Sequence, residues 1–407
     1  MAEKQLKNLI DRLQALPFVT IGIIIVNVIV MIFSYHHLNA TVINYGLIPS
    51  ELSFPRMLNA NFIHAGLVHL SINMFLLYLF GRHVERAMGK LEFLLFYLGA
   101  CFAASLLHIL IVVGTLPPYY ATRAVVGASG AVSGVMGIYA VRFHRKIFNF
   151  GGLELPALFV VMSWLGIQLG MGVLGLYRDD ILGMDLKRVG YWSHLGGFGF
   201  GFIVAILSSM ALKGEREYLI EEAEQNYDLG NLLEAIQNYE SLLKYDPVNA
   251  FAHAELGRFW AILEEEDQSI PFYKTAIELY LSQGKDEEAI EKAEEMKRFW
   301  FTAKIDAPIR LRLASYLEES GQHKPAIEAF QDIVRECAHS PEAQMALLKV
   351  GHLQLCSLGD PTSAISTLEE FQSQYPNSEW TSFAEEILTR AKAVSEDNFS
   401  NEQILAR

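Results

Sequence analysis

Polar residues that could do chemistry stand inside the apolar N-terminal half of this sequence. A serine, Ser129, lies between Gly127 and Gly130 at the start of one apolar stretch, and His194 opens another. A polar group in hydrocarbon is costly, so it usually has a partner or a function. A hydroxyl beside an imidazole can act as a nucleophile activated by a general base. Ser129 and His194 are therefore a candidate nucleophile and base.

Glycines indicate that these two residues meet. Gly197 and Gly201 follow His194 in a small-xxx-small step, and the stretch that begins at Ser129 has a glycine-rich face of its own. Small residues let helix backbones approach closely, so the pattern predicts contact between two helices. A packing face without chemistry is the alternative interpretation of Ser129 taken alone. The only acidic residue near this depth is Glu154, at an edge, so the sequence predicts a dyad rather than a triad.

Donors for a developing oxyanion are also available. Asn73 and His64 could direct N–H groups at a carbonyl oxygen as it becomes negative, which contributes roughly 2.7 to 4 kcal/mol to a transition state. His69 precedes Asn73 by four residues, so both lie on one helix face. The favoured interpretation of His69 is structural: we expect it to hold the loop before this helix by hydrogen bonds.

Six apolar stretches of roughly 15 to 22 residues must position these groups. They run Leu16 to Tyr35, Gly66 to Phe80, Phe93 to Val113, Ser129 to Phe143, Leu155 to Leu176 and Trp192 to Leu212. We expect six membrane-spanning helices. The fourth is short, which predicts that the Ser129 hydroxyl lies below the membrane surface under a cavity.

Basic residues distinguish the two ends of this expected bundle. Cytoplasmic loops are enriched in Lys and Arg, so the richer end is expected in the cytoplasm. Eleven stand at one end and five at the other: Lys4, Lys7, Arg12, Arg82, Arg86, Lys90, Arg142, Arg145, Lys146, Lys213 and Arg216 against Arg56, Arg123, Arg178, Lys187 and Arg188. Both termini are therefore predicted to be cytoplasmic, with Ser129 opening toward the outside.

The second half differs in composition. Residues 1–212 contain 14 Lys+Arg and 9 Asp+Glu, whereas residues 213–407 contain 18 and 37, so formal charges of +5 and -19 sum to -14. Such an acidic tail repels phosphate backbones, which disfavours nucleic acid as a partner. Cys101, Cys337 and Cys356 form no disulfide framework, as expected in a reducing compartment.

Helical pairs recur along residues 213–407. Ala-Ile or Ser-Ile pairs end at Ile236 and Ile270, 34 residues apart, and later steps are 37 and 38 residues. This pattern resembles the tetratricopeptide family, whose unit is about 34 residues. The stretch from Ser282 to Pro308 breaks the period, as a degenerate unit or an inserted helix would. An irregular helical domain is the alternative to a repeat solenoid.

Residues 16–212 resemble the rhomboid family of intramembrane serine proteases. The matching motifs are His64-x4-His69-x3-Asn73, Gly81-x3-Glu85-x3-Gly89, Gly127-x-Ser129-Gly130 and His194-x2-Gly197-x3-Gly201. Arg56 stands in the first external loop, where the family has a Trp-Arg pair, but Pro55 replaces the Trp. Ser193 precedes the histidine, where the family often has Ala.

The resemblance implies an all-α protein. A cytoplasmic segment (residues 1–15) would precede a six-helix rhomboid bundle (16–212) and a cytoplasmic tetratricopeptide-like solenoid (213–407). Ser129 would be the nucleophile and His194 the base and then the acid, with the Ser129 N–H, His64 and Asn73 as the oxyanion hole.

The resemblance also implies partners and a location. The substrates would be single-span membrane proteins, cut in or beside their membrane helix within a lipid bilayer, for which we expect a prokaryotic plasma (inner) membrane. The repeats are expected to bind a protein or peptide partner. The sequence has no evident motif for a metal, nucleotide or organic cofactor.

Two other functions remain open at this stage. A rhomboid-like scaffold that binds transmembrane helices without cutting them would be expected to lack Ser129 or His194. A transporter or channel would need ionisable residues along a pathway, whereas the polar groups here converge on three helices. A serine-directed fluorophosphonate probe separates a protease from both.

Overall fold

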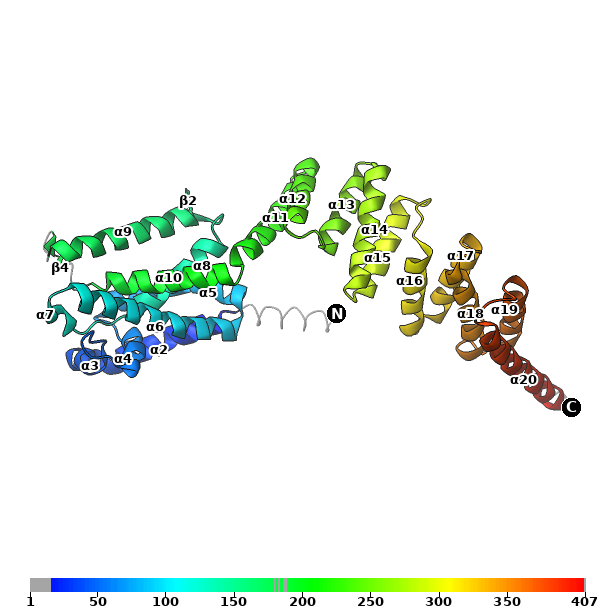
Figure 1. Ribbon diagram of the computed structural model, residues 1–407, viewed down its shortest axis with the longest axis horizontal. Helices are drawn as coiled ribbons and strands as arrows, with labels where there is room; N and C mark the ends of the chain where they lie inside the picture. Colours follow the sequence, from blue (N-terminus) through cyan, green and yellow to red (C-terminus); the bar gives the residue numbers. More distant parts are fainter. Residues whose placement is uncertain (1–15, 179, 182–183, 186–188, 406–407) are drawn as a thin grey trace. The chain divides into compact units, whose positions relative to one another are not determined.

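The structure is a computed structural model that describes residues 16–178, 180–181, 184–185 and 189–405. The chain divides into two compact units, the first ending at Tyr218 and the second beginning at Leu219. Helices dominate both units (Figure 1). The expected N-terminal segment, with its three basic residues, lies outside the described residues, as do two basic residues of the opposite end: Lys4, Lys7, Arg12, Lys187 and Arg188.

The helices of the first unit coincide with the apolar stretches and with the connections between them. In chain order they are α2 (Phe18–Ser34), η1 (Tyr35–His37), α3 (Leu38–Tyr45), α4 (Phe54–Asn59), η2 (Ala60–Phe62), α5 (Leu67–Met88), α6 (Lys90–Thr115), α7 (Pro118–Ala121), α8 (Ser129–Arg142), α9 (Ala157–Tyr177), α10 (Tyr191–Leu207) and α11 (Met210–Asp228), which continues into the second unit.

Two short antiparallel hairpins depart from the all-α expectation. They pair β1 (Ile147–Phe150) with β2 (Leu153–Pro156) and β3 (Asp180–Ile181) with β4 (Met184–Asp185). In the first, Phe148 stands opposite Leu155; in the second, Ile181 stands opposite Met184. The first hairpin joins α8 to α9, and the second lies between α9 and α10.

Among the residues that the structure describes, four helical segments are long and apolar enough to cross a membrane: Phe18–Tyr45, α5, α6 and α9. Helices α10 and α11 pass the same test together but are bent by 69°, so the count rises to five if they form one span. The expected count of six is not confirmed, because α8 has only 14 residues. A helix of this size is about 21 Å long, which is shorter than the thickness of a hydrocarbon core, about 30 Å. The sixth stretch also differs from expectation, since its helix ends at Leu207.

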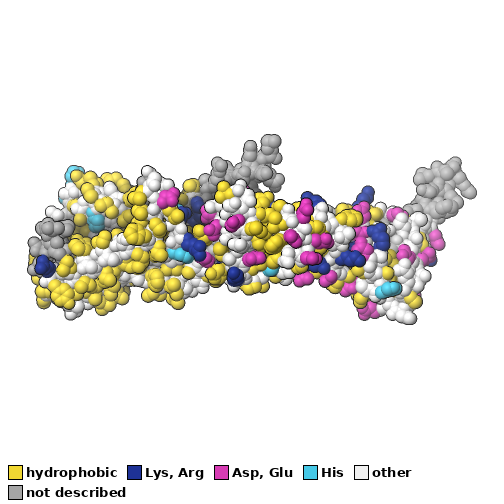
Figure 2. Space-filling view, turned by 90° about the horizontal axis from the view of Figure 1, so that it is seen from above, with side chains coloured by type: hydrophobic (Ala, Val, Ile, Leu, Met, Phe, Trp, Pro, Cys, Tyr) yellow, Lys and Arg dark blue, Asp and Glu magenta, His cyan; other side chains and the backbone are white. Residues whose placement is uncertain are grey.

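Large apolar side chains cover the outside of the first unit. Phe33 is 83% exposed, Val68 75% and Leu207 80%. Figure 2 shows hydrophobic side chains across much of the visible face of this unit, with few charges among them. Soluble monomers rarely expose apolar surface this extensively. The surface is suited to contact with lipid chains.

Helix α8 is the centre of the first unit. All its residues from Gly130 to Arg142 are buried, and it packs against α5, α6 and α10. The contact with α10 is made by backbone: a Cβ on Gly197 would lie 1.8 Å from the carbonyl oxygen of Gly130, and one on Gly201 would lie 1.9 Å from that of Gly134. Since any side chain would force the helices apart, the glycines bring the beginnings of α8 and α10 together.

Glu85 connects α5 to the beginning of α2. Its carboxylate accepts hydrogen bonds of 2.7–2.9 Å from the backbone N–H groups of Val19 and Thr20 and from the Thr20 hydroxyl. These N–H groups belong to the first turn of a helix, which has no internal partners for them. Gly81 lets Thr20 approach, because a Cβ there would lie 3.2 Å from its hydroxyl oxygen. Gly89 ends α5 with a φ of +96°.

The second unit is a succession of antiparallel helices. The small residues of the recurring pairs predicted from the sequence are all fully buried where the helices pack: Ala235, Ser269, Ala289, Ala326 and Ala364. The helices that follow α11 are α12 (Leu232–Tyr245), α13 (Ala250–Ile262), α14 (Glu266–Ser282), α15 (Asp286–Phe299), α16 (Ala307–Glu319), α17 (His323–Glu336), α18 (Pro341–Cys356), α19 (Pro361–Gln374) and α20 (Thr381–Leu405). Helix α15 occupies the stretch that breaks the repeat period.

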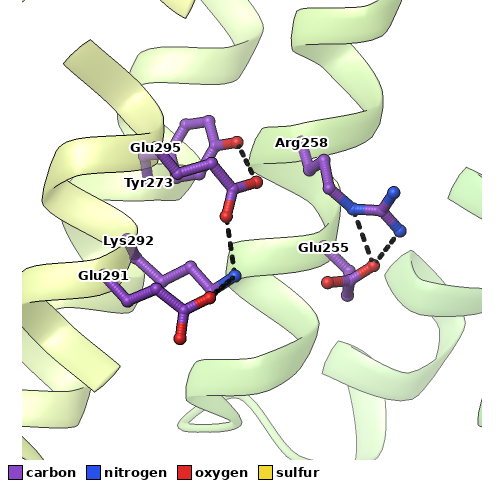
Figure 3. A network of polar contacts seen from close by, with 6 residues as sticks. All are labelled: Glu255, Arg258, Tyr273, Glu291, Lys292 and Glu295. Carbon is purple, nitrogen blue, oxygen red and sulfur yellow. Dashed lines mark hydrogen bonds and ion pairs between the residues drawn. The ribbon is translucent and has the colours of Figure 1, made fainter. Parts of the chain in front are cut away.

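A polar network stabilises the packing of α14 and α15 (Figure 3). The Tyr273 hydroxyl donates to Glu295 at 2.8 Å, and the Lys292 ammonium lies 2.7 Å from the other oxygen of that carboxylate and 3.2 Å from Glu291. Burial and the bond to Glu295 raise the pKa of Tyr273. Burial alone lowers the pKa of Lys292, but hydrogen bonds and charges from both carboxylates raise it on balance. Each polar group is thus paired.

Candidate active site

A cavity of about 600 Å³ lies at the beginning of α8. This volume is in the range of small-ligand sites. Five helices contribute polar or aromatic residues to its wall: Asn39 from α3, His69 and Asn73 from α5, Ser129 and Ser133 from α8, Trp164 from α9, and Ser193 and His194 from α10. Residues far apart in the sequence therefore converge on one cavity.

The structure places Ser129 and His194 in direct contact. The Ser129 hydroxyl oxygen lies 2.7 Å from Nε2 of His194, a hydrogen-bond distance that permits proton transfer. Ser129 is the first residue of α8, and His194 lies in the first turn of α10. The glycine contact between these helices brings the two side chains together. Their roles as nucleophile and base stay predictions.

Gly127 and Gly130 leave room around the serine. Gly127 has a φ of +132°, and a Cβ there would lie 2.6 Å from Cε1 of His69. Both the backbone conformation and the space therefore require glycine. A Cβ on Gly130 would lie 2.6 Å from the Ser193 hydroxyl and from Cβ of Ala104. These glycines let α5, α6 and α10 close around the first turn of α8.

Asn73 and His69 lie side by side on α5. The Asn73 amide is buried and donates one hydrogen bond of 2.8 Å to the carbonyl oxygen of His69, which leaves a second N–H on the same nitrogen. The His69 ring accepts a hydrogen bond of 3.4 Å at Nδ1 from the Ala65 N–H. This bond is the loop contact expected of His69, but the ring also reaches the cavity wall.

His64 lies elsewhere than the oxyanion prediction requires. Its side chain is buried behind His69, with ring centroids 5.2 Å apart, and is not among the residues that line the cavity. Its Nε2 accepts a hydrogen bond of 3.4 Å from the Ala128 N–H, so this nitrogen supports the loop before Ser129. The reason is geometric: His64 precedes α5, whereas His69 and Asn73 share the helix face that meets the cavity.

A further polar residue of the site, Gln168, was not predicted from the sequence. Its Oε1 lies 2.7 Å from Nδ1 of His194. The available signal was weak: Gln168 is the single amide side chain in the apolar helix α9. A polar group in such a helix needs a partner, but the sequence does not say which one.

Known families match both units. Residues 51–211 match the model of the Rhomboid domain, and residues 221–280 and 345–378 match models of the tetratricopeptide repeat. The chain carries a rhomboid domain followed by tetratricopeptide repeats. Helix α15 falls between the two matched repeat segments.

Several named rhomboid proteins are similar to parts of this chain. RHOMBOID-like protein 4 of Arabidopsis thaliana is 30% identical over 154 residues, 37% of this chain and 33% of that protein. The rhomboid protease GlpG of Haemophilus influenzae is 25% identical over 162 residues, 40% of this chain and 73% of that protein. The rhomboid protease GluP of Bacillus subtilis is 25% identical over 249 residues, 54% of this chain and 45% of that protein. The first match thus spans only a third of its relative.

Arg56 holds the loops of the rhomboid domain together rather than lining the cavity. Its guanidinium donates hydrogen bonds of 3.1 Å to the carbonyl oxygens of Ile43 and Gly46 and lies 3.6 Å from Glu51. Pro55, which replaces the family's Trp, lies in the first turn of α4, where proline is well tolerated. The departure from the family motif therefore has a local structural explanation.

Proposed function

We propose that this chain is an intramembrane serine endopeptidase that uses a Ser129–His194 dyad. The observation that carries the proposal is the 2.7 Å contact between the Ser129 hydroxyl and Nε2 of His194 inside a cavity of a membrane-type helix bundle. The likeness of the chain to rhomboid proteases supports the same reaction class. A non-catalytic scaffold would not require this contact.

In the proposed reaction, His194 takes the Ser129 proton as the serine oxygen attacks a peptide carbonyl carbon. The carbonyl oxygen becomes negative and is stabilised by the Ser129 backbone N–H and by Asn73 and His69. We assign His69 rather than His64 to this task, because His69 lines the cavity. His194 then protonates the leaving amine, and water hydrolyses the acyl-enzyme with His194 again acting as base.

The proposed substrates are single-span membrane proteins that enter from the lipid. A helical peptide bond has its carbonyl engaged in the i to i-4 ladder, so the substrate must unwind locally before attack. The tetratricopeptide repeats are proposed to recruit a protein or peptide partner through their helical surface. Both termini are proposed to face the cytoplasm of a prokaryotic cell, with the cavity opening outward through the inner membrane.

The test is cleavage of a single-span substrate, together with fluorophosphonate labelling, by the purified full-length chain. We expect Ser129→Ala and His194→Ala each to lose nearly all turnover. The double variant should be about as inactive as either single one, because the two residues act as a unit. Ser105→Ala is a matched control, since its buried hydroxyl donates to the Met57 carbonyl outside the cavity.

The outcomes separate the candidate functions. Substantial turnover by folded Ser129→Ala eliminates the serine protease, and turnover by His194→Ala alone points to another base. A folded wild-type protein that is neither labelled nor active, but binds transmembrane helices, supports the scaffold instead.

A further inference from the structure

The second nitrogen of the His194 ring is engaged by a residue outside the dyad. Nδ1 of His194 lies 2.7 Å from Oε1 of Gln168, while Nε2 faces Ser129 at the same distance. An amide oxygen only accepts hydrogen bonds, so this contact is a hydrogen bond in the tautomer that carries the proton on Nδ1. In a neutral imidazole the other nitrogen then bears a lone pair. That lone pair points at the serine hydroxyl, as a general base requires.

Helix α9, which carries Gln168, makes a second contact with the His194 ring. Trp164, one helical turn before Gln168 on α9, has its ring centroid 5.9 Å from that of His194. Residues four apart share a helix face, so α9 presents an aromatic surface and an acceptor to one imidazole. The centroid of the Tyr191 ring lies 6.5 Å from that of His194, and the two rings are at right angles. The ring is thus held in orientation as well as in tautomer.

We infer that Gln168 is a positioning residue for the proposed reaction, completing a Ser129–His194–Gln168 relay in which only the first two touch substrate. The inference rests on the proposed function. An amide suits this place, because a carboxylate at the same depth would have to be desolvated at considerable cost. Gln168 therefore fixes the productive tautomer without adding a charge to the membrane interior.

Two variants of the full-length chain test the inference. Gln168→Met keeps the size of the side chain but removes the acceptor. We expect kcat and the rate of Ser129 labelling by a fluorophosphonate to fall by on the order of a hundredfold, with KM changed less than about twofold, because the peptide itself does not touch Gln168. Gln168→Glu restores an oxygen acceptor and should recover at least about a tenth of the wild-type labelling rate.

Leu169→Met is the matched control. This neighbour on α9 is 49% exposed, on the lipid-facing surface, so the same new side chain should leave kcat and labelling unchanged. Wild-type rates in Gln168→Met overturn the inference, as do equally slow labelling in the Met and Glu variants and a KM effect without a kcat effect. Failure of the proposed function has a different signature, because the wild-type chain itself would then remain unlabelled.

Discussion

Asn73 and His69 are the residues we expect to stabilise the developing charge. Asn73→Ala should reduce turnover by roughly ten- to a thousandfold, because one pre-aimed donor is lost from a water-poor site. Labelling of Ser129 should persist at a lower rate, since nucleophile and base remain. Asn61→Ala is the control, because its amide donates to the Met57 carbonyl away from the cavity. Unchanged turnover in Asn73→Ala would make Asn73 a structural residue.

Substitutions of His69 and His64 should have different effects on catalysis and on stability. We expect His69→Ala to lower kcat more than His64→Ala, because only His69 lines the cavity. His64→Ala should mainly lower thermal stability, since it removes the acceptor for the Ala128 N–H. Steady-state cleavage and thermal unfolding of both variants check this assignment. A larger loss of kcat in a stable His64→Ala protein would restore the original oxyanion prediction.

At the residue scale, the sequence indicated which residues belong to the candidate site, but it did not indicate which of their atoms are in contact. Ser129 and His194 could be paired from the glycines beside them, since small residues specify close helix contact. The choice between His64 and His69 depended on the path of the loop before α5, which no spacing rule gives. Gln168 could not be assigned because one amide in an apolar helix has several potential partners until the helices are packed.

Asp360 offers a pH-dependent test at the level of a single helix. Its carboxylate accepts the Ser363 hydroxyl at 2.6 Å and the Ser363 N–H at 3.0 Å, capping α19. These bonds lower its pKa below the ordinary value of 3.8. The stabilisation is therefore present above that pH and is lost as the pH falls through the lowered pKa. Asp360→Ala should cost about 1 kcal/mol of stability at pH 7.

The measurement is urea unfolding of the second unit within the full-length chain at pH 7 and at pH 3 or below. The difference between wild type and Asp360→Ala should shrink in acid. Asp360→Asn is the control, because it keeps a capping oxygen but carries no charge, so its stability relative to Asp360→Ala should be the same at pH 7 and in acid. A difference that is constant from pH 7 into acid would show that the charge of this cap contributes nothing.

Helix existence could be predicted in both units, whereas helix ends and interruptions could not. All six apolar stretches contain a helix, but nothing in their hydropathy marks the bend between Leu207 and Met210, where Ser209 has a φ of +53°. The hairpin between α8 and α9 was not predicted either, although Gly151 and Gly152, both with a positive φ, form the turn between its strands. In the tail, helix α15 lies in the stretch where the repeat spacing changes.

For the whole molecule, we expect the repeats to add specificity rather than chemistry. Deleting residues 220–407 should leave cleavage of a generic transmembrane substrate in detergent largely intact. The cut lies beyond Glu215 and Glu217, whose carboxylates pair with Arg145 at 2.7 Å and Arg142 at 2.5 Å. A protein truncated after Leu212 lacks both ion pairs and is expected to be less stable than the 1–219 protein. Complete loss of activity in the folded 1–219 protein would make the repeats part of the catalytic machinery.

Topology can be measured on intact cells. With Cys356 changed to Ser to remove the exposed native thiol, we expect Leu52→Cys to react with an impermeant maleimide from outside and Lys213→Cys to react only after permeabilisation. Leu52 is 69% exposed in the loop after Gly46. The expectation follows from the enrichment of basic residues at the end of the bundle that holds Lys213. Labelling of Lys213→Cys from outside contradicts it.

The backbone contact between α8 and α10 has a consequence for the reading of genetic variation. Gly134, Gly197 and Gly201 carry no reactive atom, yet even alanine at the last two would collide with a carbonyl oxygen. A screen that measures only proteolysis would not distinguish substitutions of these glycines from substitutions of Ser129 or His194, because both abolish cleavage. Protein abundance separates the two classes, since a glycine allele depletes the folded enzyme whereas a Ser129→Ala allele accumulates as an intact, silent protein.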